Sequence, residues 1–266
     1  MHFKLRYILI ILIPFIFSTS CKYQKLLKST DNKTKYEKAK EYYEDGDYVK
    51  AMTLFEQLKP IYRGTEKGEE VSYYFAYCNY YTKNYILAGH YFRQFISAFP
   101  NSQFTEECTF MNAYCYYLDS PKSTLAQEST YKALDEIQLY LGRYPDNDRM
   151  EECNELIDDL TRKLQEKAYD NAFLYYKVGQ YKAASVALKS SLELYPDSEY
   201  REQTLYYIIK SDYTYALNSV YGKTADRLKE ALKDYEIFVK AFPESKYLKD
   251  LTKIHEDITK KLDFLN

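Results

Sequence analysis

The chain has 266 residues and carries 37 Lys and Arg against 39 Asp and Glu, a formal net charge of −2 at pH 7. This near balance argues against a nucleic-acid-binding protein, because such proteins usually show a strong basic surplus. Only 7 Gly and 7 Pro occur, too few for the turns of a many-stranded sheet. The composition therefore favours an all-helical protein.

Residues 1–20 have the pattern of a secretory signal peptide. Lys4 and Arg6 give a positive start, and residues 8–17 form an apolar run of ten residues. Ten residues are too few for a mature transmembrane helix, which needs about 20. We therefore predict that residues 1–20 are a signal that is removed during export.

Cys21 follows small residues at the end of the apolar run, which resembles the lipobox of bacterial lipoproteins. We predict that Cys21 is acylated as the first mature residue; an ordinary signal peptide with a nearby cysteine is the alternative. Residues 21–34 are polar and rich in lysine, and we expect them to form a tether. Its lysines either touch anionic headgroups or are simply solvated.

An alanine is followed twelve residues later by a proline at four places. A large residue stands four positions after each alanine, and an aromatic residue directly precedes each proline. These offsets place the alanine and the large side chains on one helix face, and the proline ends the helix. The pairs are Ala88 and Pro100, Ala133 and Pro145, Ala184 and Pro196, and Ala231 and Pro243. This period predicts one helical hairpin per repeat.

Repeats one, two and four match the tetratricopeptide consensus, because an alanine in each of their two helices recurs twelve residues apart. Gly46 and Gly179 mark the turns of repeats one and four, and Asn84 takes the glycine's place in repeat two. Repeats three and five are longer between their helices, and we expect the turn of the fifth at residues 221–223. After each terminal proline come residues suited to capping the next helix. They are Asn101-Ser102, Asp146-Asn147, Asp197-Ser198 and Glu244-Ser245.

The predicted fold is therefore all-α: an α-solenoid of about five tetratricopeptide-like hairpins with a C-terminal capping helix near residues 246–262. We assign repeats 1–3 to residues 35–145, and repeats 4–5 with the capping helix to residues 146–266.

The sequence offers little for catalysis. His90 and His255 each stand alone on a predicted helix, and phosphate loops, HExxH and GxSxG motifs do not occur. No nucleophile can be paired with a base. We expect no enzymatic activity, no cofactor and no metal.

Four cysteines besides Cys21 show neither a disulfide framework nor a paired CxxC pattern. We interpret them as small buried hydrophobic residues, and a link from Cys78 to another repeat stays open. The four are Cys78, Cys108, Cys115 and Cys153.

Tyrosine is unusually frequent, with 33 Tyr and no Trp. When repeats one, two and four are aligned by their alanines, tyrosines recur at two positions of the first helix, seven residues apart. Exposed tyrosines offer flat apolar area at low entropic cost and a rim of hydroxyls. We predict a groove for an extended or aromatic-bearing peptide; burial between neighbouring repeats is the alternative. The candidate residues are Tyr36, Tyr43, Tyr73, Tyr77, Tyr80 and Tyr81.

The signal with Cys21, the five repeats and the junctions FPNSQF, YPDNDR, YPDSEY and FPESKY together resemble the BamD family. These are lipoproteins of the bacterial outer-membrane β-barrel assembly machine. The break from Ser120-Pro121 to Ala133-Leu134 also looks like this family, although Ala126 stands where many relatives carry aspartate. The abundance of tyrosine and lysine looks like a Bacteroidetes-type member.

The resemblance implies a non-catalytic scaffold anchored by lipid in the inner leaflet of the outer membrane and facing the periplasm. Its implied partners are a BamA-like insertase, bound through POTRA domains, and unfolded outer-membrane proteins. In the family the N-terminal repeats are associated with the C-terminal signals of those substrates, which coincides with the tyrosine groove in residues 35–145. The C-terminal repeats are associated with the POTRA contact. The candidates for that contact are Arg162 and Lys163, which otherwise are the solvent face of a helix.

A glycan- or peptidoglycan-binding lipoprotein is the alternative function, because tyrosine faces also stack on sugar rings. Such a site would need amides and carboxylates beside the tyrosines. Repeat two offers only Asn79 and Glu70 for this role.

Overall fold

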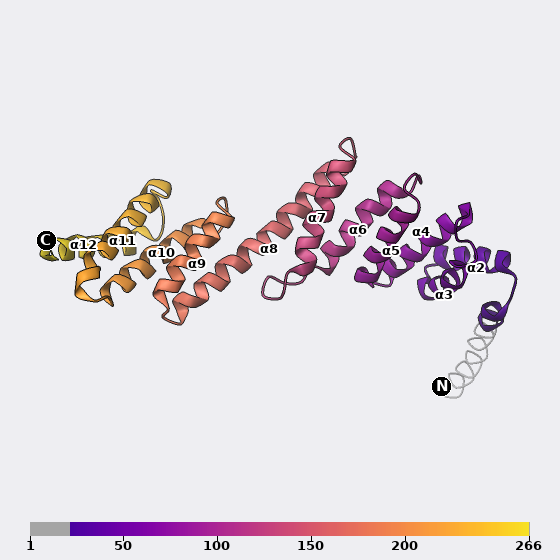
Figure 1. Ribbon diagram of the computed structural model, residues 1–266, viewed down its shortest axis with the longest axis horizontal. Helices are drawn as coiled ribbons and strands as arrows, with labels where there is room; N and C mark the ends of the chain where they lie inside the picture. The colour runs from indigo at the N-terminus through magenta and orange to yellow at the C-terminus, as the bar shows by residue number, and fades with distance from the viewer. Residues whose placement is uncertain (1–21, 266) are drawn as a thin grey trace, which may run out of the picture. The chain divides into compact units, whose positions relative to one another are not determined.

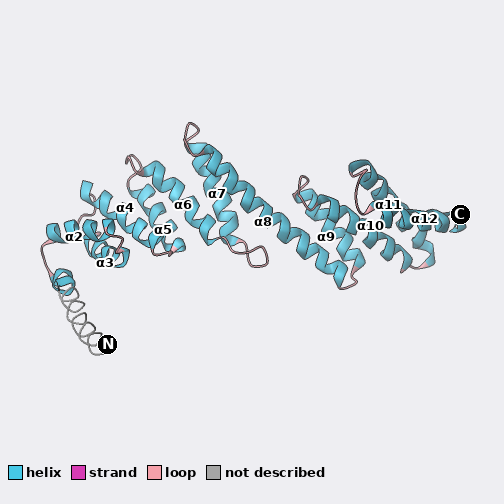
Figure 2. Cartoon of the chain, turned by 180° about the vertical axis from the view of Figure 1, so that it is seen from behind, coloured by secondary structure: helices cyan, strands magenta, loops and turns pink. Residues whose placement is uncertain are grey.

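The computed structural model describes residues 22–265, apart from the side chain of Tyr221. Every regular element in this range is a helix (Figure 1, Figure 2). The all-α prediction is therefore confirmed. The predicted signal peptide and the acylation site at Cys21 lie outside the described residues. The chain divides into two compact units.

The first unit comprises residues up to 120 together with Glu128–Cys153. Its helices pair in sequence order as three hairpins, α2 with α3, α4 with α5 and α6 with α7 (Figure 1). One hydrophobic core joins the first two hairpins and includes Phe55, Val71 and Phe75. The helices are α2 (Asn32–Glu44), α3 (Tyr48–Leu58), α4 (Glu66–Tyr81), α5 (Tyr85–Ala98), α6 (Thr105–Asp119) and α7 (Glu128–Arg143).

The second unit comprises Pro121–Gln127 and the chain from Asn154 onward, so the division falls inside α8. Its core contains residues of every helix from α8 to α12, among them Ala172, Leu188 and Ile258. Helix α12 packs on α10 and α11, in the place of the predicted capping helix. The helices are α8 (Met150–Lys177), α9 (Tyr181–Leu194), α10 (Arg201–Leu217), α11 (Tyr221–Ala241) and α12 (Leu248–Leu265).

The structure confirms the predicted roles of the alanine and the proline in each repeat that has both. The four alanines are fully buried, which lets a neighbouring helix approach closely. The residues before three of the prolines, Phe99, Tyr195 and Phe242, have φ of −131°, −134° and −135° with ψ of 61°, 73° and 66°. These values lie outside the helical region because the proline ring blocks that conformation in its predecessor. Each helix therefore ends two residues before its proline, with the aromatic residue between them.

The polar residues after the prolines act differently from the prediction. Their side-chain oxygens accept a hydrogen bond from the backbone N–H two residues later, which fixes the turn before the next helix. The acceptor–donor pairs are Ser102 with Phe104 (3.0 Å), Asn147 with Arg149 (2.8 Å), Ser198 with Tyr200 (3.2 Å) and Ser245 with Tyr247 (3.0 Å). Helices α6 and α10 themselves begin without a side-chain cap.

Two turns lie away from their predicted places. Gly46 and Gly179 adopt φ of 79° and 78°, and the equivalent left-handed residue in the second hairpin is Lys83, with φ of 62°. Asn84 is instead the residue that precedes the first turn of α5. The expected turn at residues 221–223 is helical, because α11 already begins at Tyr221.

The four described cysteines are free and buried. The disulfide left open for Cys78 is therefore not formed in this structure. Burial raises the pKa of the Cys78 and Cys115 thiols to about 12. These thiols stay protonated at neutral pH and act as small core residues.

Candidate functional site

The six predicted tyrosines lie on α2 and α4, the first helices of the first two hairpins. Tyr36 and Tyr43 are seven residues apart on α2, and Tyr73 and Tyr80 repeat that spacing on α4. Seven residues are close to two helical turns, so each pair shares one face of its helix.

Five of the six rings form a connected set, which we call the tyrosine cluster: Tyr43, Tyr73, Tyr77, Tyr80 and Tyr81. The Tyr77 ring centroid lies 4.8 Å from Tyr73, 6.2 Å from Tyr80 and 5.9 Å from Tyr81. Tyr43 joins the set through Tyr81 at 6.0 Å. The sixth ring, Tyr36, instead packs edge-on against Tyr62.

Tyr77 and Tyr36 are the most buried of the six, at 7% and 9% exposure. The Tyr77 hydroxyl donates to the carboxylate of Glu107 on α6, and the Tyr36 hydroxyl donates to Glu70 on α4. Burial raises the pKa of both phenols, and the carboxylate partners raise it further. These two rings therefore pack between neighbouring hairpins. For Tyr36 and Tyr77 this matches the alternative of burial between repeats and not an exposed groove.

Tyr81 is the exposed member of the tyrosine cluster, at 44%. Its ring stacks on Tyr48 of α3, with centroids 4.4 Å apart and planes 17° apart. Tyr43, Tyr73 and Tyr80 are half-buried. Burial raises the pKa of Tyr73 to about 12, so its hydroxyl is protonated at neutral pH. The accessible part of the cluster thus presents ring faces with a rim of hydroxyl groups.

The ring series extends beyond the residues chosen from sequence. Tyr80 lies 6.4 Å from Tyr114 on α6, and Tyr114 stacks on Tyr117 at 5.8 Å. Tyr48, Tyr114 and Tyr117 are therefore additional candidates. A recurring spacing points to Tyr48: tyrosines five residues apart meet across a turn in three hairpins. These pairs are Tyr43 with Tyr48, Tyr80 with Tyr85 and Tyr176 with Tyr181.

A second aromatic series lies in the second unit, outside the six predicted tyrosines. It begins on α8, where Tyr169, Phe173 and Tyr176 stack in succession at 5.6 and 5.9 Å. It crosses to α10 through Tyr207, 4.9 Å from Tyr176. It ends with Tyr206 and Tyr247, stacked at 4.3 Å.

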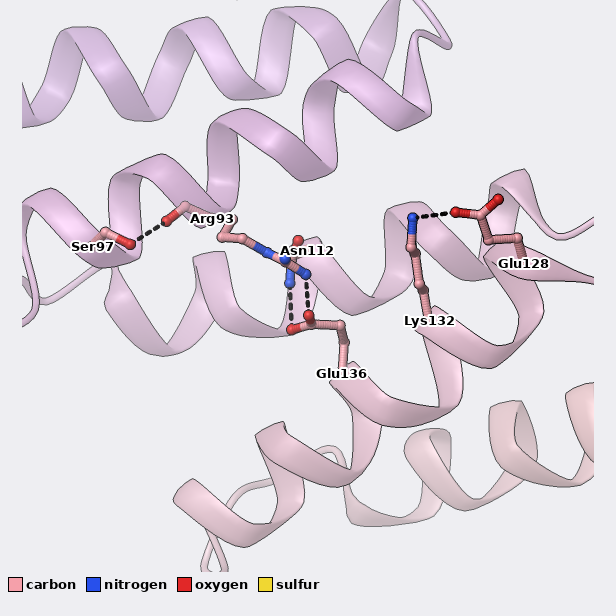
Figure 3. Close-up of polar contacts among 6 residues, drawn as sticks. All are labelled: Arg93, Ser97, Asn112, Glu128, Lys132 and Glu136. Carbon is pink, nitrogen blue, oxygen red and sulfur yellow. Dashed lines mark hydrogen bonds and ion pairs between the residues drawn. The ribbon is translucent and has the colours of Figure 1, made fainter.

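Polar contacts fix the helices beside the tyrosine cluster (Figure 3). Glu136 of α7 pairs with the guanidinium of Arg93 on α5 and accepts a hydrogen bond from the Asn112 amide on α6 at 2.6 Å. The Asn112 residue is 1% exposed. Helices α5, α6 and α7 are therefore joined at one carboxylate. Because α4 packs on α5, this connection favours a rigid support for α4 and α6.

The polar residues that a glycan site would need are already engaged. Asn79 is 2% exposed, and its amide donates to the Phe75 carbonyl at 2.8 Å. Glu70 accepts from Tyr36 and lies 3.6 Å from the Lys40 ammonium. Both side chains are therefore occupied within the protein, and the structure gives the glycan alternative no specific support.

Arg162 and Lys163 lie in the middle of α8, in the second unit. The Arg162 side chain is 59% exposed and lies 3.6 Å from both Asp159 and Glu199. Arg162 and Lys163 line a shallow hollow of about 350 Å³ beside residues 122–123. The Lys167 ammonium donates to the carbonyls of Ser123 and Leu125, which holds this loop against α8.

A basic hollow of about 670 Å³ lies in the first unit, between the end of α3, the start of α4 and α5. The Lys59 ammonium stands over the Phe75 and Tyr91 rings at 4.4 and 4.3 Å, and burial lowers its pKa. The lining contains no Asp or Glu, and its basic residues are Lys59, Arg63, His90 and Arg93. This charge disfavours metal cations. Across the described part of the chain, no group of three or more potential ligands is arranged for a metal ion.

Comparison with known proteins decides the family. A model of the YfiO family, described as outer membrane lipoproteins, matches residues 28–226, well over half of the chain. The chain belongs to the YfiO family. This match confirms the resemblance to BamD-type outer membrane lipoproteins. Within the described residues, no helix has both the length and the apolar composition needed to span a bilayer.

The other comparisons add little about this YfiO-family chain. None of the curated proteins matches it. A solved structure described as a human IFIT1 dimer with PPP-AAAA is 16% identical, with a TM-score of 0.31. The likeness covers 85% of this chain but only 57% of the IFIT1 chain. A TM-score this low supports no functional argument.

Proposed function

We propose that this YfiO-family lipoprotein is a non-catalytic scaffold for outer-membrane β-barrel assembly. Acylation at Cys21 anchors it to the periplasmic face of the outer membrane. The first unit receives the C-terminal signals of unfolded outer-membrane proteins, and the second unit binds the POTRA domains of a BamA-like insertase. Family membership supports the location, and the surfaces of the two units support the division of roles.

The observation that carries the substrate role is the connected ring series of the first unit. It runs from Tyr48 and Tyr81 through Tyr80 to Tyr114 and Tyr117, across three hairpins. Tyrosine rings are rigid, so a peptide that stacks on them orders few new rotamers. Each aromatic pair contributes about 0.5–1.5 kcal/mol beyond area burial. An extended segment with aromatic or apolar side chains suits such a surface.

The partner role relies on Arg162 and the hollow beside it. Both ion pairs of Arg162 measure 3.6 Å and involve exposed carboxylates. Exposed pairs of this kind contribute about 0–1 kcal/mol. Exchange of Asp159 or Glu199 for a carboxylate of the partner therefore costs little. An acidic edge of a POTRA domain fits this requirement.

Affinity purification of the acylated protein from detergent-solubilised membranes tests the scaffold role. We expect a POTRA-bearing insertase to co-purify, with lower recovery for Arg162→Glu. Lys182→Glu is the matched control, because Lys182 is exposed on α9. Absence of the insertase from the wild-type sample, under conditions that preserve membrane complexes, would contradict the proposed partner. Equal recovery with both variants would remove Arg162 from the contact.

A further inference from the structure

The segment that follows Cys21 is a docked helix and not a solvated stretch. Residues 22–28 are helical, and Tyr23, Leu26 and Leu27 pack on the core of the first hairpin. The Tyr23 ring meets Tyr42 edge-on at 5.6 Å, and its hydroxyl donates to the Lys50 carbonyl at 3.2 Å. The segment therefore moves with the first hairpin.

A buried lysine secures the end of this segment. Lys35 of α2 is 6% exposed, and its ammonium donates to the Leu27 carbonyl at 3.0 Å and to the Gln57 side chain at 2.8 Å. Asp31 then begins α2 by accepting from the backbone N–H groups of Lys33 and Thr34. Little free chain remains between residue 22 and the first hairpin.

The opposite side of the same helix carries Lys22, Lys25 and Lys28. A spacing of three residues places them on one side, and all three are exposed. Within the described chain, none of the three has a carboxylate at ion-pair distance, whereas nearby Lys38 and Lys50 do. Their charges are therefore available to an external anion.

The charge distribution of the chain favours a negatively charged surface at this end. Residues 22–40 contain seven lysines against two acidic residues, whereas residues 41–266 contain 28 basic against 37 acidic residues. A helix rises about 1.5 Å per residue, so Lys22 and Lys28 lie about 9 Å apart along the helix. This distance is close to the Debye length of about 8 Å at physiological ionic strength.

We propose that Lys22, Lys25 and Lys28 bind anionic lipid headgroups and hold the first hairpin directly against the bilayer surface. We call these residues the lysine collar. The proposal depends on acylation of Cys21 but not on the peptide or insertase roles. The acyl group supplies the attachment to the bilayer, and the lysine collar adds electrostatic attraction to anionic lipids. Because the helix is docked, they fix the orientation of the first unit as well as its location.

Vesicle co-sedimentation isolates the electrostatic part of this anchor. The Cys21→Ser chain, which carries no acyl group, is mixed with vesicles of phosphatidylcholine alone or with added phosphatidylglycerol. Each lysine near an anionic surface contributes about fivefold in partition, or about a hundredfold for three. We expect binding only to the phosphatidylglycerol vesicles, loss of binding at high salt, and about a hundredfold weaker partition for K22Q/K25Q/K28Q.

The triple variant K182Q/K229Q/K240Q is the matched control, because it removes the same charge from exposed lysines of the second unit. It should partition like the parent chain. Equal weakening by both triple variants would show that net charge alone governs binding and would overturn the proposal. So would a failure of the parent chain to bind phosphatidylglycerol vesicles. Circular dichroism confirms that each variant is folded.

Orientation is tested on the acylated protein in proteoliposomes. The chain contains no Trp, so Gln24→Trp, on an exposed position of the docked helix, introduces a unique fluorophore. Brominated phospholipids should quench this introduced indole strongly in anionic bilayers and less in the K22Q/K25Q/K28Q background. Equal quenching in both backgrounds would overturn the orienting role. Mass spectrometry of Cys21 provides a separate check: an unmodified cysteine would overturn the proposal, whereas a missing insertase would not.

Discussion

The two units contain similar aromatic series, and the same kind of hydrogen bond, from a tyrosine hydroxyl to a carboxylate, anchors each series. In the first unit the tyrosine cluster packs on other rings, and Tyr77 donates to Glu107 of the next hairpin. In the second unit Tyr206 and Tyr213 of α10 donate to Asp250 and Asp257 of α12, at 2.7 and 2.6 Å. In both units a tyrosine hydroxyl joins one helical layer to the next.

A lysine between two largely buried aspartates distinguishes the second unit from the tyrosine cluster of the first unit. In the second unit the Lys189 ammonium of α9 lies 3.0 Å from both Asp212 of α10 and Asp234 of α11. The two aspartate side chains are only 12% and 11% exposed. The second unit therefore depends on an ionic centre, whereas the tyrosine cluster of the first unit is neutral. A neutral, ring-lined surface suits an apolar peptide, and an ionic centre suits a fixed support.

Removal of Lys189 should have the largest effect on stability. Lys189→Ala leaves Asp212 and Asp234 buried without a cation, and loss of one partner of a buried pair costs about 3–5 kcal/mol. We expect about 3 kcal/mol, because the lysine itself is partly exposed. Urea denaturation measures this change. Lys182→Ala on the same helix is the control and should stay near wild type; equal stability of the two variants would refute the ionic centre.

The pH dependence of stability should reveal Asp234. Burial raises the pKa of this carboxyl to about 6, from an unfolded value of 3.8, despite the nearby Lys189. A raised pKa means that the folded state binds the proton more tightly, so this contribution is present below pH 4 and is lost as pH rises through 6. The expected span is about 2–3 kcal/mol.

Asp234→Asn removes the titrating group and should flatten this part of the profile. The measurement is the difference between wild-type and Asp234→Asn unfolding free energies at several pH values from about 4 to about 7. Carboxylates outside the Lys189–Asp212–Asp234 group titrate alike in both proteins and cancel in the difference. A difference independent of pH would contradict the raised pKa.

In the first unit, loss of the Tyr77 hydroxyl should destabilise the protein by about 1–2 kcal/mol. Tyr77→Phe removes the hydrogen bond to Glu107 but keeps the ring. Hydrogen bonds to charged groups contribute about 1.5–3 kcal/mol, and Glu107 retains its ion pair with Arg149. Tyr81→Phe, at an exposed ring, should change stability little. If Tyr81→Phe lost more stability than Tyr77→Phe in thermal or urea unfolding, Tyr77 would not be an important contact between hairpins.

The smallest predicted effect is a gain in stability, at the left-handed residue Lys83. Lys83 occupies the left-handed turn position that Gly46 and Gly179 fill in other hairpins. A side chain in this conformation costs about 1–2 kcal/mol, and Lys83→Gly should recover about 1 kcal/mol in urea unfolding. Lys229→Gly, at an exposed position inside α11, should instead cost about 1 kcal/mol. A loss of stability in both variants would argue against strain at Lys83.

The sequence predicted what local periodicity encodes. The interval from Ala88 to Pro100 fixed both the buried helix face and the end of α5, because those features depend on residues within a few turns. Contacts between hairpins were not predictable in this way. Nothing in the local pattern relates Tyr77 to Glu107, thirty residues away, or Lys189 to Asp234.

The packing of residues 22–28 was also not predictable, because their composition is polar. Residues 22–28 look solvated because lysines alternate with Tyr23, Leu26 and Leu27, yet those three side chains dock on the first hairpin. Only the resemblance to a family makes Arg162 a candidate contact, and the structure adds its exposure and weak ion pairs. The role of such a residue depends on a partner that the sequence does not contain.

The affinity of the first unit for a C-terminal signal peptide tests the central claim most directly. Tyr81 is the suitable residue to change, because truncation of the buried Tyr77 would also weaken the fold. A labelled peptide ending in an aromatic residue is titrated into wild type, Tyr81→Ala and Tyr175→Ala. Tyr175 is a similarly exposed tyrosine of the second unit, at 47%. We predict a loss of about 1–3 kcal/mol for Tyr81→Ala alone; equal affinity of all three proteins would contradict the proposed peptide surface.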